Sequence, residues 1–357
     1  MWNTVLSVLW SVGSFVVIIG ICVLVHEYGH YITARLLGVQ VHEFALGMGP
    51  LVKQWTRRSG GARMLWSLRA LPVGGFCRLA GMGEEAEGEA VVPGMGFNEQ
   101  PAWKRFFILM DGSLGNLALA LVLTAAFLYG HGYQNMNDTK IGTLLEGFPA
   151  ARADIRPGDR IVRVNGEPVS AWREMSASLR KAALEGDVTL TLEREGRTFD
   201  LSTAIPVSRE HGYPMLGITP AVERYTALES ARNAAGYVGQ MSVLMYRAIW
   251  EWITQHQEME VTGPIGIASM SGRAMRDGLW SFVTFLSMIS LNLGLLNLLP
   301  FPALDGGRIL FVLLEMLFRR RLPEKAENWI HTTGFVLLIT LMIFVTWQDI
   351  YRLFFTQ

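Results

Sequence analysis

The sequence has few charged residues for its length. Of its 357 residues, 17% are charged and 50% are hydrophobic, whereas soluble chains of this size carry about 25% charged residues. This deficit favours a lipid bilayer over a large soluble core as the environment of the chain. The formal net charge is zero, which gives no reason to expect a nucleic-acid partner.

Cysteines and signal-peptide features are also scarce. Cys22 and Cys77 lie far apart in the sequence, which excludes a disulfide framework and a four-cysteine zinc site. Residues 1–25 lack a basic segment before their apolar run and lack an Ala-x-Ala-like cleavage site, so a cleaved signal peptide is not expected. We expect this first segment to remain as a membrane anchor.

Four apolar stretches are long enough to cross a hydrocarbon layer about 30 Å thick, which takes roughly 20 helical residues. A fifth stretch, 226–255, places apolar residues every three or four positions between charged ones, which indicates a helix on a surface. We therefore expect a polytopic α-helical membrane protein with four transmembrane helices. The four apolar stretches are 4–25, 106–129, 279–299 and 329–347.

The basic residues predict an orientation. Residues 40–80 contain one acidic residue, Glu43, against six basic ones, and residues 319–321 are three consecutive arginines. The positive-inside rule places both connections in the cytoplasm. The segment between the second and third spans, and both termini, are then expected outside a bacterial inner membrane. The six basic residues are Lys53, Arg57, Arg58, Arg63, Arg69 and Arg78.

The segment between the second and third spans has the pattern of a small β-rich domain, in which strand-like runs alternate with turn signals at 156–159 and 165–166. The stretch "GFPAARADIRPGDRIVRVNGEPV" resembles a bacterial PDZ domain, which we expect over residues 138–223. A generic β-rich domain is the alternative. The resemblance also implies that the backbone of Leu216, Gly217 and Ile218 forms a peptide-binding loop that captures a chain end.

The stretch His26-Glu27-Tyr28-Gly29-His30 directly follows the first apolar run. Residues four apart share one face of an α-helix, so His26 and His30 can present two imidazoles to one metal ion. Glu27 lies beside them, where it can act as a base without being a ligand. The alternative is three buried residues in an anchor helix. Because an ionisable residue near a membrane interior costs on the order of 3 kcal/mol without a partner, we expect a metal site.

A catalytic zinc commonly takes three protein ligands and keeps one position for water, so the third ligand must come from elsewhere. Asp305 follows the third apolar stretch, with two prolines before it to end the helix and two glycines after it to allow close backbone approach. Counting spans places Asp305 on the same side of the membrane as the histidines, provided that 226–255 does not span. An ordinary turn residue is the alternative for Asp305.

Together these features resemble the site-2 protease family of intramembrane zinc metalloproteases. The H-E-x-x-H of the first span is followed by a G-x-x-x-N in the second (Gly112 to Asn116), the PDZ-like segment, and N-x-x-P-x-P-x-L-D-G (Asn297 to Gly306). Order and spacing are similar to the RseP/RasP branch, the bacterial regulators of sigma-factor signalling, over nearly the whole chain.

The resemblance implies a Zn²⁺ enzyme in which His26, His30 and Asp305 are the ligands and Glu27 is the general base. Asn297 matches an asparagine that helps to hold the substrate, with a helix-packing amide as the alternative. The implied reaction is hydrolysis of the transmembrane segments of single-span proteins, such as an anti-sigma factor or signal-peptide remnants. The PDZ domain is expected to control substrate access.

The sequence departs from the family at two points. Relatives often carry two tandem PDZ domains, whereas this chain has room for one, and Asp111 replaces a residue that is more often small and apolar. Two other functions compete, a membrane-anchored PDZ scaffold with a non-catalytic zinc site and a metal transporter. The transporter is disfavoured because the remaining histidines do not extend a path of ligands across the bilayer; they are His42, His131, His211, His256 and His331.

The expected organisation therefore runs in one order along the chain. It comprises a first transmembrane helix with H-E-x-x-H (1–37), a cytoplasmic-side membrane-associated β-loop (38–105), a second transmembrane helix (106–130), an extracytoplasmic PDZ domain (138–223), an amphipathic surface helix (225–256), a third transmembrane helix (279–300), the L-D-G motif with a cytoplasmic loop (301–328), and a fourth transmembrane helix (329–350).

Overall fold

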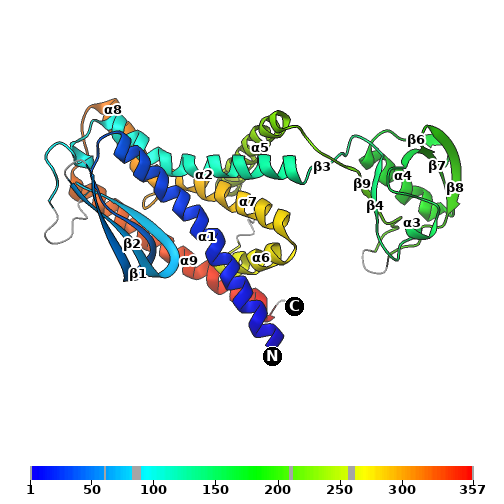
Figure 1. Ribbon diagram of the computed structural model, residues 1–357, viewed down its shortest axis with the longest axis horizontal. Coiled ribbons are helices and arrows are strands. Elements are labelled where there is room, and N and C mark those ends of the chain that lie inside the picture. The colour runs from blue at the N-terminus through cyan, green and yellow to red at the C-terminus, as the bar shows by residue number, and fades with distance from the viewer. Residues whose placement is uncertain (1, 60–61, 83–89, 209–211, 256–261, 356–357) are drawn as a thin grey trace. The chain divides into compact units, whose positions relative to one another are not determined.

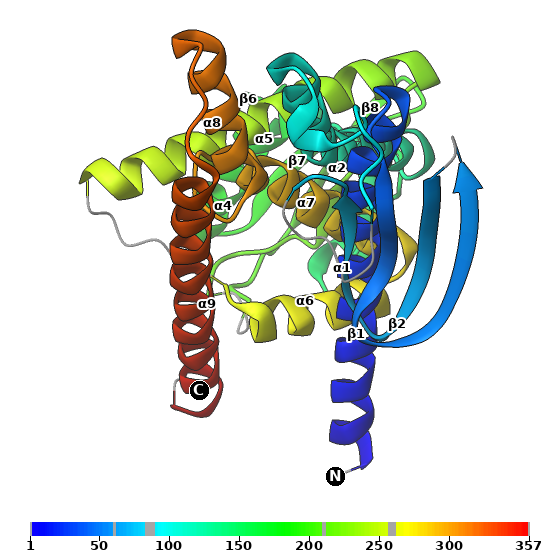
Figure 2. The same ribbon diagram turned by 90° about the vertical axis from the view of Figure 1, so that its left-hand side faces the viewer.

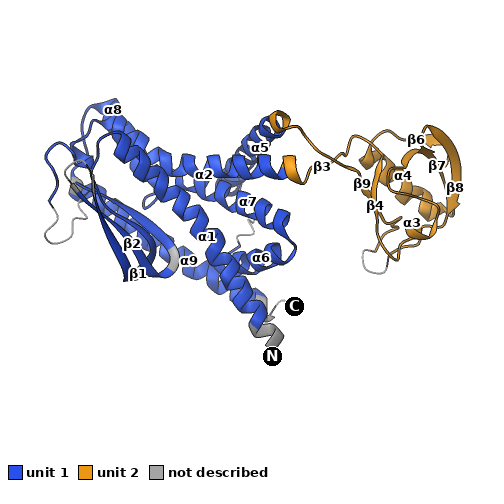
Figure 3. Cartoon of the chain, in the orientation of Figure 1, with its two compact units in different colours: residues 1–127, 230–357 blue, residues 128–229 orange. Residues whose placement is uncertain are grey.

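The structure is a computed structural model, which describes residues 2–59, 62–82, 90–208, 212–255 and 262–355. The chain forms two compact units, shown in different colours in Figure 3. Unit 1 comprises residues 1–127 and 230–357, and unit 2 comprises residues 128–229. His211, His256 and part of the expected β-loop, namely 60–61 and 83–89, lie outside the described residues.

The described part of unit 1 contains four helices that are long and apolar enough to cross a membrane. The number of such helices agrees with the expectation of four apolar stretches of spanning length. Helix α1 alone has 35 residues, about 52 Å at 1.5 Å per residue, which exceeds a hydrocarbon layer of about 30 Å. The four are α1 (Trp2–Leu36), α2 (Ala102–Gly130), α7 (Leu279–Asn297) and α9 (Glu324–Phe355).

Two long strands, β1 (Val41–Ser59) and β2 (Ala62–Leu79), form an antiparallel hairpin that lies along α1 (Figures 1 and 2). Residues 43–46 of β1 pair with residues 65–68 and also with residues 75–78 of β2, and register shifts interrupt the pairing between residues 41 and 53. Irregularities of this kind bend a strand and increase its twist. The buried carboxylate of Glu43 on β1 accepts hydrogen bonds from Ser67 and Arg69 on β2. The segment 38–105, expected to be a β-loop, thus contains β strands.

Helix α5 (Ala227–Gln255) is not among the helices that could span a membrane by length and hydropathy in the described part of the chain. Val238 and Met241 of α5 pack against a small cluster formed by Ala120 of α2 and Leu291 of α7. One face of α5 therefore covers the bundle, as expected of an amphipathic helix that lies on a surface.

Two shorter helices of unit 1 were not predicted. Helix α6 (Pro264–Arg276) packs against α1 and α9. Helix α8 (Asp305–Phe318) occupies much of the segment 301–328 that we expected to be a loop. Its residues Ile309 and Val312 are buried in one cluster with Ile108 and Leu109 near the start of α2 and with residues of the β1–β2 hairpin, so much of the expected loop is an amphipathic helix. A single turn, η1 (Phe97–Glu99), precedes α2.

Unit 2 is rich in β structure and has its own apolar core. Alternate residues of β7, Val188, Leu190 and Leu192, are fully buried and face Met175 of α4. The sheets have the strand orders β6-β5-β7-β8, β4-β9 and β3-β10. The elements are β3 (Tyr133–Gln134), β4 (Ile141–Leu144), α3 (Pro149–Arg152), β5 (Arg160–Val164), β6 (Glu167–Pro168), α4 (Trp172–Glu185), β7 (Val188–Arg194), β8 (Arg197–Thr203), β9 (Ile218–Pro220) and β10 (Val222–Glu223).

A buried ion pair fastens the turn before β5 to the end of β7. Arg194 donates to both oxygens of Asp159, at 2.7 and 2.8 Å, and the Arg156 N–H donates to the same carboxylate at 2.7 Å. Burial alone would raise the pKa of the Asp159 carboxyl, but these hydrogen bonds from Arg194 and Arg156 outweigh burial and hold that pKa below its ordinary value.

We predict that Asp159→Asn lowers the free energy of unfolding of unit 2 by about 1–3 kcal/mol at pH 7, because a bidentate, charge-assisted pair is lost. A carboxyl whose pKa is lower in the folded state stabilises the fold fully at pH values above its unfolded-state pKa of about 3.9. This contribution is lost as the pH falls through the folded-state pKa. Urea unfolding of residues 128–229 at pH 7 and pH 3 measures both effects.

The exposed Asp187 provides the matched control, since Asp187→Asn removes the same charge without removing this pair. The role given to Asp159 is wrong if both variants unfold at the wild-type urea concentration at pH 7.

Candidate functional site

The structure brings the side chains of His26, His30 and Asp305 together. In the described part of the chain they form the single group of three or more histidine, cysteine or acidic side chains close enough to hold one metal ion. Both histidines are buried, and they come from α1, whereas Asp305 is the first residue of α8. Residues almost 280 positions apart in the sequence therefore share one site.

The spacing of the three atoms fits a tetrahedral metal. The His26 Nε2–Asp305 Oδ2 distance is 3.0 Å, the His30 Nε2–Asp305 Oδ2 distance is 3.3 Å, and the two Nε2 atoms are 3.2 Å apart. Ligands bound at 2.0–2.1 Å in a tetrahedron lie about 3.3 Å from one another. The buried Asp305 Oδ2 has no hydrogen-bond donor among the described residues, which is the state expected of a metal ligand.

The other ring nitrogen of each histidine determines which atom is available for a metal. His30 Nδ1 lies 2.7 Å from the carbonyl oxygen of Ile108 on α2. Because that oxygen can only accept, Nδ1 carries the hydrogen and Nε2 of the neutral ring keeps its lone pair. Such a hydrogen bond to the second nitrogen is typical of metal-binding histidines.

His26 has a comparable neighbour in the fully buried Asn116 of α2. The Asn116 amide lies 3.5 Å from His26 Nδ1, and Asn116 Oδ1 has no hydrogen-bond partner among the described residues. A half-turn of the amide places Oδ1 where it accepts from the His26 Nδ1–H, and this satisfies both groups. Asn116, which the sequence analysis singled out only as the end of the G-x-x-x-N pattern, therefore orients His26.

Two glycines allow α1 and α2 to approach closely enough for these contacts. A Cβ on Gly29 would overlap the carbonyl of Asp111, and a Cβ on Gly112 would overlap the imidazole of His30. Asp111 itself accepts a hydrogen bond from the hydroxyl of Thr33, so its carboxylate links the two helices.

A tight turn between α7 and α8 places Asp305. Ala303 has a φ of +78°, a left-handed conformation that is unfavourable for a residue with a Cβ. The Ala303 N–H donates to Nδ1 of His331 on α9 at 3.1 Å. Cβ atoms on Gly306 and Gly307 would overlap the carbonyls of Leu299 and Phe301, which confirms the predicted close approach at both glycines.

Glu27 lies next to the two histidines and contacts the β1–β2 hairpin. Its Oε2 accepts a hydrogen bond of 2.8 Å from the Cys77 N–H on β2. Gly75 of the same strand lies beside this side chain, since a Cβ added there would meet Glu27 Cγ at 3.8 Å, an ordinary contact distance. One carboxylate oxygen is thus held by backbone, which orients the other.

The remaining residues singled out in the sequence lie apart from this group. Asn297 is the last residue of α7, and its side chain forms no hydrogen bond with a described residue. In unit 2, the side chain of Leu216 is part of the core, Gly217 has a φ of +82°, and Ile218 begins β9. The carbonyls of Leu216 and Gly217 accept from the Ala150 and Leu145 N–H groups.

Sequence reasoning missed several partners of the site. The Ile108 carbonyl and the Cys77 N–H are backbone groups, which leave no signature in the residue type. His331 was considered only as a metal ligand, and instead it accepts a hydrogen bond from the turn that carries Asp305. The presence of a histidine in an otherwise apolar stretch was the one feature of the sequence that could have indicated this role of His331.

Comparison with known proteins gives consistent matches over nearly the whole chain. The model of the family described as "Peptidase family M50" matches residues 14–341. Proteins named "Putative zinc metalloprotease" from Fusobacterium nucleatum, Clostridium acetobutylicum and Rickettsia conorii are each 31% identical to this chain. The matches cover 95%, 93% and 96% of this chain and 98%, 94% and 99% of the respective relatives.

A solved structure also matches part of the chain. It is the crystal structure of the PDZ domain of an SdrC-like protein from Listeria monocytogenes, which is 15% identical and matches with a TM-score of 0.21. The match covers 24% of this chain and 87% of the Listeria domain.

We predict that Gly112→Ala lowers the affinity of the purified protein for a divalent metal about 10- to 100-fold, as do other changes next to metal ligands. The added methyl group must displace the His30 ring or part α1 from α2. Metal content after dialysis against a graded chelator measures the affinity.

Gly13→Ala makes the same change in α1 where a Cβ meets no atom within 4 Å, and it should bind metal as the wild type does. Wild-type affinity in a folded Gly112→Ala protein would contradict the geometry described for His30.

Proposed function

The chain belongs to peptidase family M50, the site-2 protease family, and from this premise we propose that it is an intramembrane zinc endopeptidase. Its proposed substrates are the transmembrane segments of single-span proteins, such as an anti-sigma factor or signal-peptide remnants. The observation that carries the proposal is the convergence of His26, His30 and Asp305 beside Glu27 on helices that can cross a membrane.

His26, His30 and Asp305 are the proposed zinc ligands, and their two nitrogens and one oxygen are a donor set typical of catalytic zinc. Bound Zn²⁺ supplies a Lewis acid that polarises the scissile carbonyl and acidifies water. Glu27 is the proposed general base. With one oxygen held by the Cys77 N–H, its other oxygen can take a proton from the attacking water and deliver it to the leaving amine.

The β1–β2 hairpin is the proposed binding surface for an unwound substrate. A transmembrane helix pairs all its backbone groups internally, so the cleaved part must become extended, and its freed groups need partners in a lipid environment. Residues 43–46 of β1 pair with residues 65–68 and also with residues 75–78 of β2. The free edge beside the Cys77–Glu27 contact is therefore that of residues 75–78, which can add an extended segment. Asn297 is proposed to contact the substrate near the metal.

The proposed orientation follows from the basic residues. The connections 38–105 and 301–328 face the cytoplasm of a bacterial inner membrane, which leaves the active site toward that side. Unit 2, inserted between α2 and α5, is then extracytoplasmic. We assign to it a PDZ-like role in limiting access to substrates, with Leu216, Gly217 and Ile218 as the proposed loop for a chain end.

A membrane-anchored scaffold with a non-catalytic zinc site is the second candidate. Such a scaffold requires metal binding and partner binding but no aligned base. The hydrogen bond that orients Glu27 toward the histidines favours the enzyme over this scaffold. A transporter is disfavoured because the candidate ligands in the described residues gather in one group.

We predict that Glu27→Gln retains zinc and lowers the rate of hydrolysis of a single-span substrate by about 10²- to 10⁴-fold, the usual contribution of a general base. The amide oxygen of glutamine can still accept from the Cys77 N–H, so the fold is preserved. Zinc content by mass spectrometry and cleavage of a single-span reporter in detergent are the measurements.

The exposed Glu146→Gln in unit 2 is the matched control and should cleave at the wild-type rate. If the Glu27→Gln protein binds zinc and cleaves normally, Glu27 is not the base. If the wild-type protein binds zinc and a partner but cleaves nothing, the scaffold is the correct function.

A further inference from the structure

The short connection between α7 and α8 that positions Asp305 contains a strained residue. Ala303, two residues before Asp305, has a φ of +78°, a left-handed conformation that is unfavourable for a residue with a Cβ. Such a conformation persists only where the surrounding structure holds it. The contacts that hold Ala303 therefore also determine where the Asp305 carboxylate lies.

The N–H group of this strained residue is bonded to another helix. The Ala303 N–H donates to Nδ1 of His331 on α9 at 3.1 Å. The two prolines of the connection have no N–H to donate. The other N–H groups between residues 299 and 304 donate locally to carbonyls of residues 296–301, and they belong to Leu299, Phe301 and Leu304. His331 is thus the side chain that ties the left-handed residue to α9.

Packing fixes His331 in this position. Gly334 lies one turn beyond His331 on the same face of α9, and a Cβ on Gly334 would overlap Pro302 of the connection. The His331 ring also packs edge-on against Phe311 of α8, with 5.5 Å between the ring centroids. The imidazole therefore lies between the connection and α8, which gives its hydrogen bond a defined direction.

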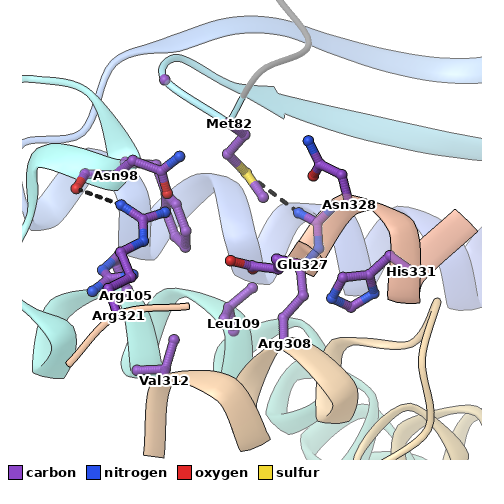
Figure 4. Close-up of a pocket in the computed structure, with 12 residues that line it drawn as sticks. Met82, Asn98, Arg105, Leu109, Arg308, Val312, Arg321, Glu327, Asn328 and His331 are labelled. Carbon is purple, nitrogen blue, oxygen red and sulfur yellow. Dashed lines mark hydrogen bonds between the residues drawn. The ribbon is translucent and has the colours of Figure 1, made fainter. Parts of the chain in front are cut away.

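His331 also lines a cavity of about 260 Å³ in unit 1, together with Arg308, Glu327 and Asn328 (Figure 4). Because Nδ1 accepts, Nε2 of the neutral ring carries the hydrogen, and this buried Nε2 has no hydrogen-bond partner among the described residues. The cavity is polar and large enough for a water molecule that accepts from Nε2. Such a hydrogen bond would keep the hydrogen on Nε2 and leave Nδ1 as the acceptor for Ala303.

We propose that His331 is a positioning residue of the metal site, because its hydrogen bond to Ala303 fixes the left-handed turn that places the Asp305 carboxylate beside the two histidines of α1. A change of φ at Ala303 turns the backbone that follows it and displaces Asp305. A metal site tolerates deviations of only about 0.2 Å in its ligand distances, so a small displacement weakens metal binding. This role of His331 rests on the proposed function, in which Asp305 is a metal ligand.

We predict that His331→Leu weakens Zn²⁺ binding by the purified full-length protein about 10- to 100-fold, the usual cost of losing a group that orients a metal ligand. Leucine keeps an apolar side chain in α9 but cannot accept from the Ala303 N–H. His331→Asn keeps an acceptor, Oδ1, near the position of Nδ1, and should bind Zn²⁺ more tightly than His331→Leu. Competition with a chelator measures the affinity, and the visible absorption of bound Co²⁺ reports the coordination geometry.

Ala303→Gly distinguishes positioning from a general structural role of His331. Glycine adopts a positive φ without strain, so it does not need the hydrogen bond to hold that conformation. The double variant His331→Leu/Ala303→Gly should therefore recover most of the affinity that His331→Leu loses, which a double-mutant cycle records as a coupling between the two positions. A glycine at position 303 would not restore the packing of α9, so a purely structural role of His331 predicts no recovery.

Thr332→Leu is the matched control, because Thr332 is the exposed neighbour of His331 on α9; it should bind Zn²⁺ as the wild type does. Equal Zn²⁺ affinity of His331→Leu, Thr332→Leu and the wild type overturns the proposal. An affinity of the double variant that is no higher than that of His331→Leu also overturns it.

Cleavage of the single-span reporter separates the role of His331 from the proposed function. The expected order of Zn²⁺ affinities in a protein that cleaves nothing supports the role of His331 and contradicts the protease function alone. A wild-type protein that cleaves the reporter, with a His331→Leu variant that binds Zn²⁺ equally well, contradicts the role of His331 alone. A wild-type protein that binds no metal contradicts both.

Discussion

Three hydrogen-bond acceptors face one another inside a helix bundle, and the arrangement of unit 1 depends on this convergence. Nε2 of His26, Nε2 of His30 and Oδ2 of Asp305 lie within 3.0 to 3.3 Å of one another. The hydrogen bond from His30 to Ile108 directs the lone pair of Nε2 into this space. Partial negative charges this close are costly in a medium of low polarity, and a cation among them replaces the repulsion by coordination. The convergence of the three acceptors is therefore unfavourable without a cation and favours the binding of a cation.

The elements around the site are held by close backbone contacts, since between membrane helices the lipid chains remove most of the hydrophobic driving force for association. Gly29 and Gly112 let α1 and α2 cross without side chains between them, and Gly306 lets the start of α8 fold back on the end of α7. Polar contacts join different elements at single points. Thr33 of α1 donates to Asp111 of α2, and the Ala303 N–H of the α7–α8 turn donates to His331 of α9. The distances between the helices are thus determined by small residues, and the orientations of the side chains by single hydrogen bonds.

The sequence was sufficient where one physical rule dominated. Hydropathy identified the four spans, helical periodicity placed His26 and His30 on one face, and counting spans singled out Asp305. Helix α8 was not predicted, because it is too short to be recognised as a membrane span and because its first turn contains two glycines, which are poor helix formers. The helix is stabilised by the packing of Ile309 and Val312. The Ile108 carbonyl and the Cys77 N–H could not be predicted, because every residue except proline carries both groups.

The hairpin explains how chemistry that consumes water can operate on an apolar helix. Backbone that is not helical is tolerated at membrane depth only where it is buried in protein or lines a wet cavity, and β2 runs along α1 at the level of Glu27. In the proposed function, the element that supplies the Cys77 N–H to Glu27 is also the one whose polar groups would accompany water and an extended peptide to the proposed metal ligands. In α1 the backbone groups near Glu27 are used within the helix, so a backbone donor to this carboxylate has to come from a second, non-helical segment, which here is β2.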